Sequence, residues 1–330
     1  MGTDLTKQDL PRPAASVWCS YLDEWDRSLR ARNRPQTTRY NYQLAVTQLA
    51  EFLRVDLPGY LVSCGAGSDA LSDDDAAEDP TDVAKAHVEW FVAWMIETRS
   101  VSTALNKYKC VQQFFNYLVQ EEEMARHPME RMSQPDGSTK LVPVLSNDEV
   151  AALVATCSGK SFIDRRDLAI IRLLFDTGGR LSEVALLPLD GVDQKRDCVL
   201  LHGKGDKQRV VPFGPKTGQA LVRYLRARAK HAGSKLPELW LAERGGRAFS
   251  PNGVKLMLRR RGRMAGIENM HAHRLRHTLA HEWQLAGGNE GDLMAVMGWS
   301  SREMLRHYGA SAAEVRAQEA HRSLDLGSRV

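Results

Sequence analysis

Apolar residues recur at helical spacing through the N-terminal part of the chain. In residues 15–30, one stripe is spaced by four, three and four positions: Trp18, Leu22, Trp25 and Leu29. Comparable stripes predict a second helix that ends at Leu53, a third that runs through Val88 and Ile96, and a fourth that begins at Ser102 or Thr103. Four amphipathic helices in succession predict a compact all-α domain over residues 15–132.

Two stretches lack such stripes. Residues 56–82 contain glycines, serines and a DDD run, which predicts a long loop, and its acidic part, residues 69–82, gives no sign of a role. Residues 133–144, with the sequence SQPDGSTKLVPV, have the proline, glycine and polar content of a linker. We therefore expect a second domain over residues 145–330.

The second domain opens with helical signals. Ser146 and Glu149 form a capping box, and a later stripe through Leu168 and Phe175 leads into the sequence DTGGR, which ends at Arg180. The two glycines allow a tight turn before another helix over residues 181–187. Arg180 is therefore expected at a loop-to-helix junction, where backbone amides also face anions.

A small β element follows. Residues 198–202 and 209–213 alternate in the manner of strands, and the sequence GKGDK from Gly203 to Lys207 predicts a hairpin turn between them. Lys204 would stand on that hairpin.

Helical patterns then resume. They predict a helix over residues 217–230, a very basic helix opened by Ser250-Pro251, and a helix that runs from His273 to a stop at Gly287-Gly288. Two short helices, 292–297 and 301–307, lead to Tyr308, and residues 311–324 predict one more helix in the tail. The predicted fold class is mainly α, with a small β-sheet or hairpin in the second domain.

Composition narrows the class of protein. Of the 330 residues, 26% are charged and 43% are hydrophobic, which is ordinary for a soluble chain. No apolar run approaches the ~18 residues of a membrane span, and the N-terminus does not resemble a secretory signal. The five cysteines are scattered and never spaced as C-x-x-C, which is typical of reduced thiols in a cytosolic protein. We expect a cytoplasmic protein without a membrane partner.

Charge is unevenly distributed. Residues 1–142 contain 15 Lys+Arg against 21 Asp+Glu, whereas residues 143–330 contain 30 against 20. A basic C-terminal part suits a polyanion, because phosphate contacts release counterions. The distribution favours nucleic acid as a partner but does not decide it.

The candidate catalytic residues are of the types that attack on a DNA phosphodiester would require. Charge builds on the phosphate oxygens as a nucleophile arrives, and Arg180 and Arg276 are the candidates to neutralise it with fixed guanidinium groups. Lys204 is the candidate acid for the departing 5′ oxygen. The Tyr308 hydroxyl must lose its proton as it attacks, and His273 could accept that proton or bind a phosphate oxygen.

Five motifs occur in a fixed order and carry a family resemblance. They are Thr177-Gly-Gly-Arg180-Leu-Ser-Glu183, Gly203-Lys204-Gly-Asp-Lys207-Gln-Arg209, His273-Arg-Leu-Arg276-His277, Met297-Gly-Trp299 and Tyr308. With them the chain resembles the tyrosine recombinase (phage integrase) family, which includes the Xer and Cre recombinases. The resemblance covers about residues 15–310.

The resemblance implies a site-specific DNA recombinase and assigns a role to each motif residue. Arg180 and Arg276 would clamp the phosphate, Tyr308 would be the nucleophile, Lys204 the general acid, His273 the proton acceptor and Glu183 a supporting carboxylate. Most Xer-like members have histidine where this chain has Trp299, whereas Cre has tryptophan, whose indole N–H can still donate to a phosphate oxygen. This departure weakens the case for a second proton-transfer histidine.

The resemblance also implies an architecture and a pathway. A helical core-binding domain, of the SAM-like kind, and the catalytic domain would form a C-shaped clamp around duplex DNA that carries specific recombination sites. Strands would be exchanged through a 3′-phosphotyrosyl intermediate and a Holliday junction in a homotetramer, with the tail beyond Tyr308 docked on a neighbouring protomer. No cofactor or metal would be needed, and the protein would work on DNA of the nucleoid.

Other functions remain open at this point. His273, His277 and His281 are spaced to share a helical face and could ligate a metal, although no HExxH motif accompanies them. The chain could be a catalytically silent DNA-binding accessory protein of the same fold. A type IB topoisomerase or a telomere resolvase shares the chemistry as well.

Basic residues outside the motifs are candidate DNA contacts. They lie off the apolar stripes of the first domain, on the hairpin and on the basic helix: Arg39, Lys107, Lys109, Lys207, Arg209, Lys255 and Arg259. The target DNA sequence, the biological role among chromosome-dimer resolution, integration and transposition, and any accessory factors are not readable from the sequence.

Overall fold

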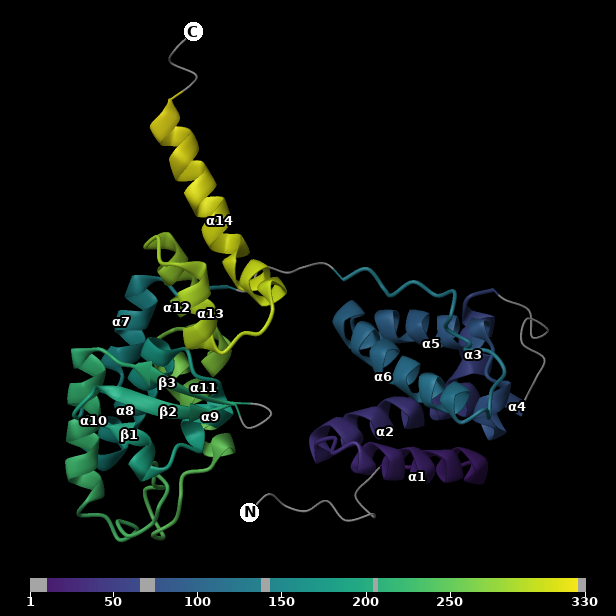
Figure 1. Ribbon diagram of the computed structural model, residues 1–330, viewed down its shortest axis with the longest axis horizontal. Coiled ribbons are helices and arrows are strands. Elements are labelled where there is room, and N and C mark those ends of the chain that lie inside the picture. The colour runs from purple at the N-terminus through teal and green to yellow at the C-terminus, as the bar shows by residue number, and fades with distance from the viewer. Residues whose placement is uncertain (1–10, 66–74, 138–142, 204–206, 326–330) are drawn as a thin grey trace. The chain divides into compact units, whose positions relative to one another are not determined.

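The computed structural model describes residues 11–65, 75–137, 143–203 and 207–325, and within the last helix it describes residues 306–312, 314, 316 and 320 by their backbone alone. Contacts divide the chain into two compact units, Met1–Ser138 and Thr139–Val330. Both units are mainly helical, and the strands belong to the second (Figure 1). The predicted fold class, mainly α with a small β element, is confirmed. Among the described residues, no helix has the length and apolarity required to cross a bilayer.

The first unit is built on aromatic residues. Its helices are α1 (Ser16–Ala31), α2 (Gln36–Glu51), α3 (Leu57–Ser63), α4 (Asp75–Glu78), α5 (Lys85–Thr98) and α6 (Val101–Gln120), with a π-helical turn at Phe52–Asp56 and a 3-10 turn at Pro80–Asp82. The predicted stripe of α1 is buried, and the ring of Trp25 stacks on Tyr42 at 5.3 Å between centroids. Ser100 caps α6, two residues before the predicted start.

The prediction of a long loop over residues 56–82 is wrong for much of this segment. Helix α3 begins at Leu57, and α4 and the 3-10 turn occupy Asp75–Glu78 and Pro80–Asp82. Leu57, Leu61 and Ala76 are buried in the core of this unit, which explains why these segments are ordered. The acidic residues 69–74 lie outside the described residues.

The second unit surrounds helix α8. Its helices are α7 (Asn147–Ala155), α8 (Phe162–Thr177), α9 (Leu181–Ala185), α10 (Pro215–Arg228), α11 (Pro251–Met264), α12 (Ala272–Leu285), α13 (Glu290–Met297) and α14 (Arg302–Leu324). The capping box at Ser146 and Glu149 and the Ser250-Pro251 start of α11 are confirmed. Helix α8 buries Ile170, Leu173 and Leu174 and packs against α10 and α12 (Figure 1).

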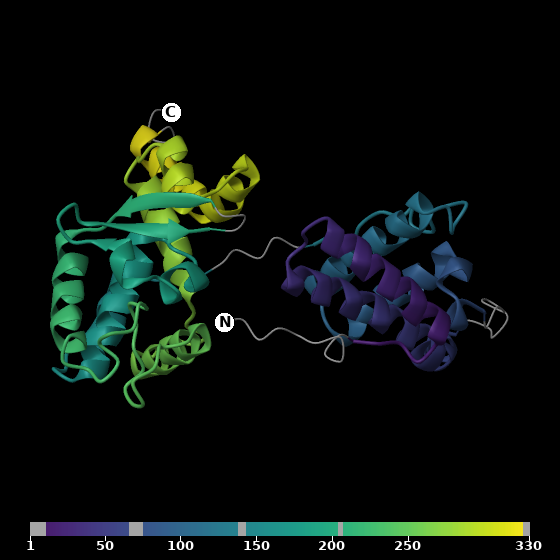
Figure 2. The same ribbon diagram turned by 60° about the horizontal axis from the view of Figure 1, so that its bottom comes forward.

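A three-stranded antiparallel sheet lies beside these helices. Its order is β1 (Val192–Asp193), β2 (Cys198–His202) and β3 (Gln208–Pro212), and the short β1 was not predicted from the sequence. In the register, Val199 faces Val211 and Leu201 faces Arg209. The sheet contacts α9 and α13 (Figure 2), so that its β3 edge lies near the end of α13.

The C-terminal part corrects one prediction. Instead of a short helix over residues 301–307 and a separate tail helix, a single helix, α14, runs from Arg302 to Leu324. The helix continues through Gly309, because one glycine in a helix interior costs only about 1 kcal/mol, which the flanking helix formers offset. Helix α14 packs against α12.

Candidate active site

Arg180 is positioned by the turn between α8 and α9. Gly178 ends α8 with φ of +58°, and a Cβ there would lie 2.5 Å from the Met297 sulfur, so that both the conformation and the space require glycine. Arg180 then occupies the N-cap of α9 in an extended conformation. Its side chain is 38% exposed, and its Nη1 donates to Glu183 Oε1 at 2.7 Å. It is therefore both accessible and oriented.

Glu183 receives two arginines. Its side chain is 3% exposed and pairs with Arg180 and with Arg209, and Oε2 also accepts the Arg180 backbone N–H at 2.9 Å. Burial alone would raise the pKa of this carboxyl group, but the hydrogen bonds from Arg209 and Arg180 outweigh burial and lower the pKa to about 2. Glu183 is thus an anion that holds the Arg180 guanidinium at the turn.

The lowered pKa of Glu183 predicts how stability depends on pH. Because the folded pKa of about 2 lies below the ordinary 4.5, the ionised carboxylate stabilises the fold above the ordinary pKa, and this contribution is lost as the pH falls towards 2. In Glu183→Gln, the free energy of unfolding should fall less steeply over that range than in the unsubstituted protein. Urea unfolding at a series of pH values measures the free energy of unfolding of both proteins. If the two plots of this free energy against pH were parallel, the lowered pKa of Glu183 would be contradicted.

Arg276 is buried beneath the same turn. It lies on α12 with 1% of the residue exposed, its Nη1 donates to the carbonyl oxygen of Gly178, and its Nη2 donates to that of Met297 at 2.6 Å. Its guanidinium carbon lies 5.5 Å from the centroid of the Trp299 ring. Gly178 precedes Arg180 by two residues, so the structure brings the two predicted arginines to one turn although they are far apart in sequence.

Trp299 and Arg180 line one groove. This hollow of about 410 Å³ is lined by residues of the α8–α9 turn, the β2–β3 hairpin and the end of α13: Arg180, Gly203, Lys207, Gln208, Arg209, Met294, Ala295, Gly298, Trp299 and Ser300. Trp299 is 7% exposed. The groove therefore gathers three of the five sequence motifs.

Two predicted catalytic groups cannot be placed in full. Lys204 lies outside the described residues, although Gly203 and Lys207, on either side of it, line the groove. Tyr308 lies in α14, where the backbone alone is described. Their roles therefore stay predictions.

The three histidines of α12 differ in exposure. His273 is exposed, whereas His277 and His281 are 4% and 8% exposed. The rings of His273 and His277 meet edge to face, with 5.4 Å between centroids. Among the described residues, no group of three or more His, Cys, Asp or Glu side chains is arranged to hold a metal ion. The arrangement leaves His273 as the solvent-facing member.

The candidate DNA contacts separate into two groups. Lys109, Lys207, Lys255 and Arg259 are exposed. Arg39 instead pairs with Asp26 at 2.7 Å, Lys107 is half-buried, which lowers its pKa, and Arg209 is engaged with Glu183. Sequence patterns placed Arg39 and Lys107 off the apolar stripes and Arg209 on the hairpin. Such patterns carry no information about the acidic residues that Arg39 and Arg209 meet.

The basic helix α11 is anchored by some of its own arginines. Arg261 donates from Nε to the fully buried Asp167 at 2.9 Å and from Nη2 to Asp164 at 2.9 Å, and Arg260 also reaches Asp167 at 3.0 Å. These pairs fix α11 to α8. They leave Lys255 and Arg259 on its exposed face.

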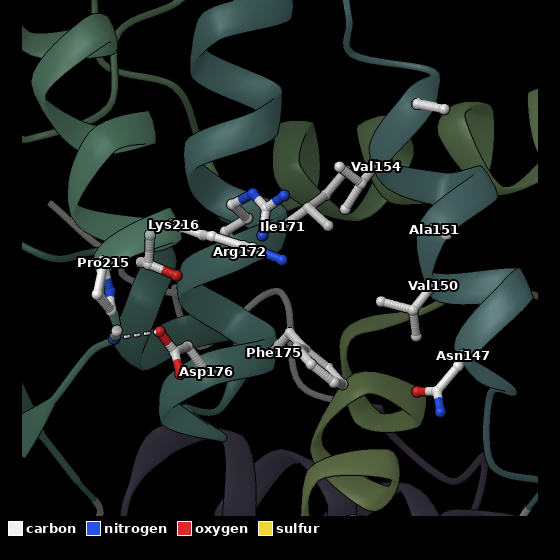
Figure 3. A pocket seen from close by; sticks show the side chains of 13 residues that line it. Asn147, Val150, Ala151, Val154, Ile171, Arg172, Phe175, Asp176, Pro215 and Lys216 are labelled. Carbon is white, nitrogen blue, oxygen red and sulfur yellow. Dashed lines mark hydrogen bonds between the residues drawn. The ribbon is translucent and has the colours of Figure 1, made fainter.

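A larger cavity of about 750 Å³ lies elsewhere in this unit, between α7, α8 and α10 (Figure 3). Its lining is mostly apolar, with Val150, Val154, Ile171 and Phe175 among its residues. The Asp176 carboxylate accepts the Gly214 N–H at 2.6 Å at one side of it. None of the predicted catalytic residues that the structure describes lines this cavity, so we assign the candidate active site to the groove at Arg180.

Comparison with known proteins agrees with this geometry. A model of the phage integrase family matches residues 143–314, which is more than half of the chain. The chain belongs to the phage integrase family. A second model, of the N-terminal SAM-like domain of phage integrases, matches residues 21–123. The two family models thus fall on the two units of this chain.

Relatives of this chain are tyrosine recombinases. It is 31% identical to tyrosine recombinase XerC of Actinobacillus pleuropneumoniae over 239 residues, which cover 71% of this chain and 74% of that protein. It is 33% identical to XerC of Azotobacter vinelandii over 216 residues, covering 65% and 68% of the two chains. These relatives support a tyrosine recombinase of the Xer type.

Solved structures share the fold. XerH site-specific recombinase, in a post-cleavage complex with a palindromic difH substrate, matches with a TM-score of 0.68 at 19% identity, covering 91% of this chain and 84% of that one. A lambda integrase dimer bound to a COC′ core site matches with a TM-score of 0.65 at 14% identity, covering 88% and 94%. At such identities the likeness concerns the fold.

Proposed function

We propose that this chain is a site-specific DNA recombinase that breaks and rejoins strands through a tyrosine–DNA bond. The observation that carries the proposal is the convergence of Arg180, Arg276 and Trp299 at one turn beside a groove in a chain of this family. Two fixed cations there suit a phosphodiester, since the attack concentrates negative charge on the non-bridging oxygens.

The proposed reaction keeps the number of phosphoester bonds constant. The Tyr308 oxygen attacks phosphorus, a phosphotyrosyl bond forms at the 3′ side and the bond to the 5′ oxygen breaks. His273 takes the phenolic proton and Lys204 gives a proton to the departing 5′ oxygen. In the reverse step a 5′ hydroxyl, from the same or another strand, attacks the phosphotyrosine. Each step exchanges one phosphoester for another, so no external energy source is needed.

The two units would divide the work. We assign residues 15–132 to core-site DNA binding, residues 133–144 to the linker and residues 145–330 to catalysis, in line with the two family models. Exposed Lys109, Lys207, Lys255 and Arg259 are the DNA contacts that we retain from the sequence. A tetramer on DNA, a Holliday-junction intermediate and docking of the tail between protomers belong to the same proposal. So does action in the cytoplasm, on DNA of the nucleoid.

A covalent adduct tests the proposal. A library of randomised duplexes, each carrying a nick that lets the cleaved fragment diffuse away, is incubated with the full chain and resolved under denaturing conditions. We expect a protein–DNA adduct on a defined subset of sequences. Binding without any adduct would indicate the silent accessory protein, and relaxation of supercoiled DNA without sequence preference would indicate a topoisomerase.

Chelation separates this chemistry from metal-assisted hydrolysis. Because the charge on the phosphate is neutralised by arginines, EDTA should leave the yield of adduct unchanged. The adduct is quantified with and without the chelator, with a restriction enzyme that requires Mg²⁺ as the positive control. Inhibition by EDTA that added Mg²⁺ or Zn²⁺ reverses would revive a metal site on α12.

A further inference from the structure

Arg209 joins parts of the groove that come from distant parts of the sequence. It stands on β3, where its Nη1 and Nη2 donate to the two oxygens of Glu183 at 3.2 and 2.7 Å. Its Nε donates to the backbone carbonyl of Val296, in the last turn of α13, at 2.8 Å. All three donor positions of one guanidinium are thus directed at protein groups, and the side chain is 13% exposed.

These contacts complete a closed ring. Arg180 is held by Glu183, Glu183 by Arg209, and Arg209 by the end of α13 at Val296. The next residue, Met297, accepts from Arg276, and Arg276 also donates to Gly178, two residues before Arg180. The ring therefore links the two arginines proposed to bind the phosphate.

The backbone beside Arg209 is shaped to receive it. Gly298 ends α13 with φ of +63°, and a Cβ at this position would lie 3.1 Å from Arg209 Nη1 and 3.2 Å from its guanidinium carbon. Glycine therefore allows both the left-handed turn and the close approach of the guanidinium. The turn continues directly into Trp299, so the position of Arg209 and the path of the chain to Trp299 are set together.

We propose that Arg209 is a positioning residue of the recombinase, which holds Arg180 and the Gly298–Trp299 turn in register through Glu183 and Val296, and does not contact DNA. The inference rests on the proposed function, because it concerns the same groove. It replaces the expectation that Arg209 binds a phosphate.

Arginine suits this place better than lysine. A planar guanidinium reaches both carboxylate oxygens and a carbonyl at once, whereas an ammonium is a single point donor on a flexible stem. Arg209→Lys keeps the charge and loses this geometry, and Arg209→Met loses both. A positional error of about 1 Å at a reacting centre can lower a rate about 10²-fold.

The test uses the full chain and a nicked duplex that the unsubstituted protein cleaves. Under single-turnover conditions at saturating protein, we expect the rate of adduct formation to fall about 10- to 100-fold in Arg209→Met and by less in Arg209→Lys, with the Kd for the same duplex unchanged. Arg196→Met is the matched control, since Arg196 lies in the same unit, its side chain is 84% exposed, and the substitution removes the same charge. Thermal unfolding confirms that each variant is folded.

A second readout distinguishes positioning from general loss of structure. If Arg209 acts through Glu183, Arg209→Met should slow cleavage less in a Glu183→Gln background than in the unsubstituted protein. The acid limb of the pH–rate profile should also move to higher pH in Arg209→Met, because Glu183 loses a donor to its ionised form, and Glu183→Gln should remove that shift.

Each outcome bears on the inference. A normal cleavage rate in Arg209→Met, or additive effects of the two substitutions, overturns it while the adduct of the unsubstituted protein keeps the proposed function intact. A weaker Kd with a smaller salt dependence and an unchanged rate at saturation would restore Arg209 as a phosphate contact. Absence of an adduct with the unsubstituted protein, by contrast, refutes the proposed function itself.

Discussion

Tyr308→Phe should bind the recombination site with the affinity of the unsubstituted protein and form no covalent adduct. The substitution removes one oxygen and leaves the aromatic ring, so that it deletes the nucleophile and changes little else. Denaturing gels measure the adduct and gel-shift titration measures the Kd. An adduct in this variant would place the nucleophile at another residue.

Tyr224 supplies the control for that experiment. It and Tyr308 are the two tyrosines of the sequence beyond residue 138. Tyr224 is fully buried, its hydroxyl donates to the Leu239 carbonyl and accepts the Leu241 N–H, and burial raises its pKa to about 12. Tyr224→Phe should therefore lower the free energy of unfolding by about 1–3 kcal/mol, since a buried amide loses its acceptor, and still form the adduct.

Arg180→Ala should slow cleavage by about 10²-fold or more, on the scale of losing one donor to a developing oxyanion. The fold should persist, because Glu183 keeps its pair with Arg209 at 2.7 Å when Arg180 is removed. Single-turnover adduct formation at saturating protein gives the rate, and thermal unfolding reports the fold.

The lysine variant refines this result. Arg180→Lys keeps the positive charge but not the planar pair of donors, so its rate should lie between those of Arg180→Ala and the unsubstituted protein. Cleavage by Arg180→Ala at the normal rate would show that the phosphate is neutralised elsewhere, and the assignment of the clamp would be wrong.

Elements with strong local signals were predicted well from the sequence. The stripe of Trp18, Leu22, Trp25 and Leu29, the capping box at Ser146 and the proline start of α11 each depend on residues close in the chain, and the structure confirms them. The strands β2 and β3 were recognised within one residue by their alternation. The two-residue β1 was missed because so short a strand has no period.

Predictions failed where tertiary contacts decide the structure. Residues 57–63 were expected in a loop. They form helix α3 because Leu57 and Leu61 are buried in the hydrophobic core of the first unit. The break expected before residue 311 did not occur, since a single helix spans Arg302–Leu324. Local composition cannot report either effect, because both depend on neighbours that are distant in sequence.

The candidate site shows the same division. The motifs identified Arg180, Arg276 and Trp299 as candidate site residues, and the structure brings these three residues together. The partnership of Glu183 with Arg209 could not be predicted from the sequence, because the two lie 26 positions apart and nothing local pairs them. One available signal was the Glu183 carboxylate itself, because a carboxylate in a motif otherwise suited to binding an anion calls for donor or basic partners.

The ring through Arg180, Glu183, Arg209 and Arg276 has a consequence for catalysis. Its links end on backbone carbonyls of Gly178 and Val296–Met297, which the helices α8 and α13 hold in place. The dipoles and charges of the groove are therefore oriented when the chain folds, before any phosphate arrives. In the proposed reaction, water around a free phosphodiester would have to reorganise as the charge shifts, whereas these groups would meet the shifting charge already aligned.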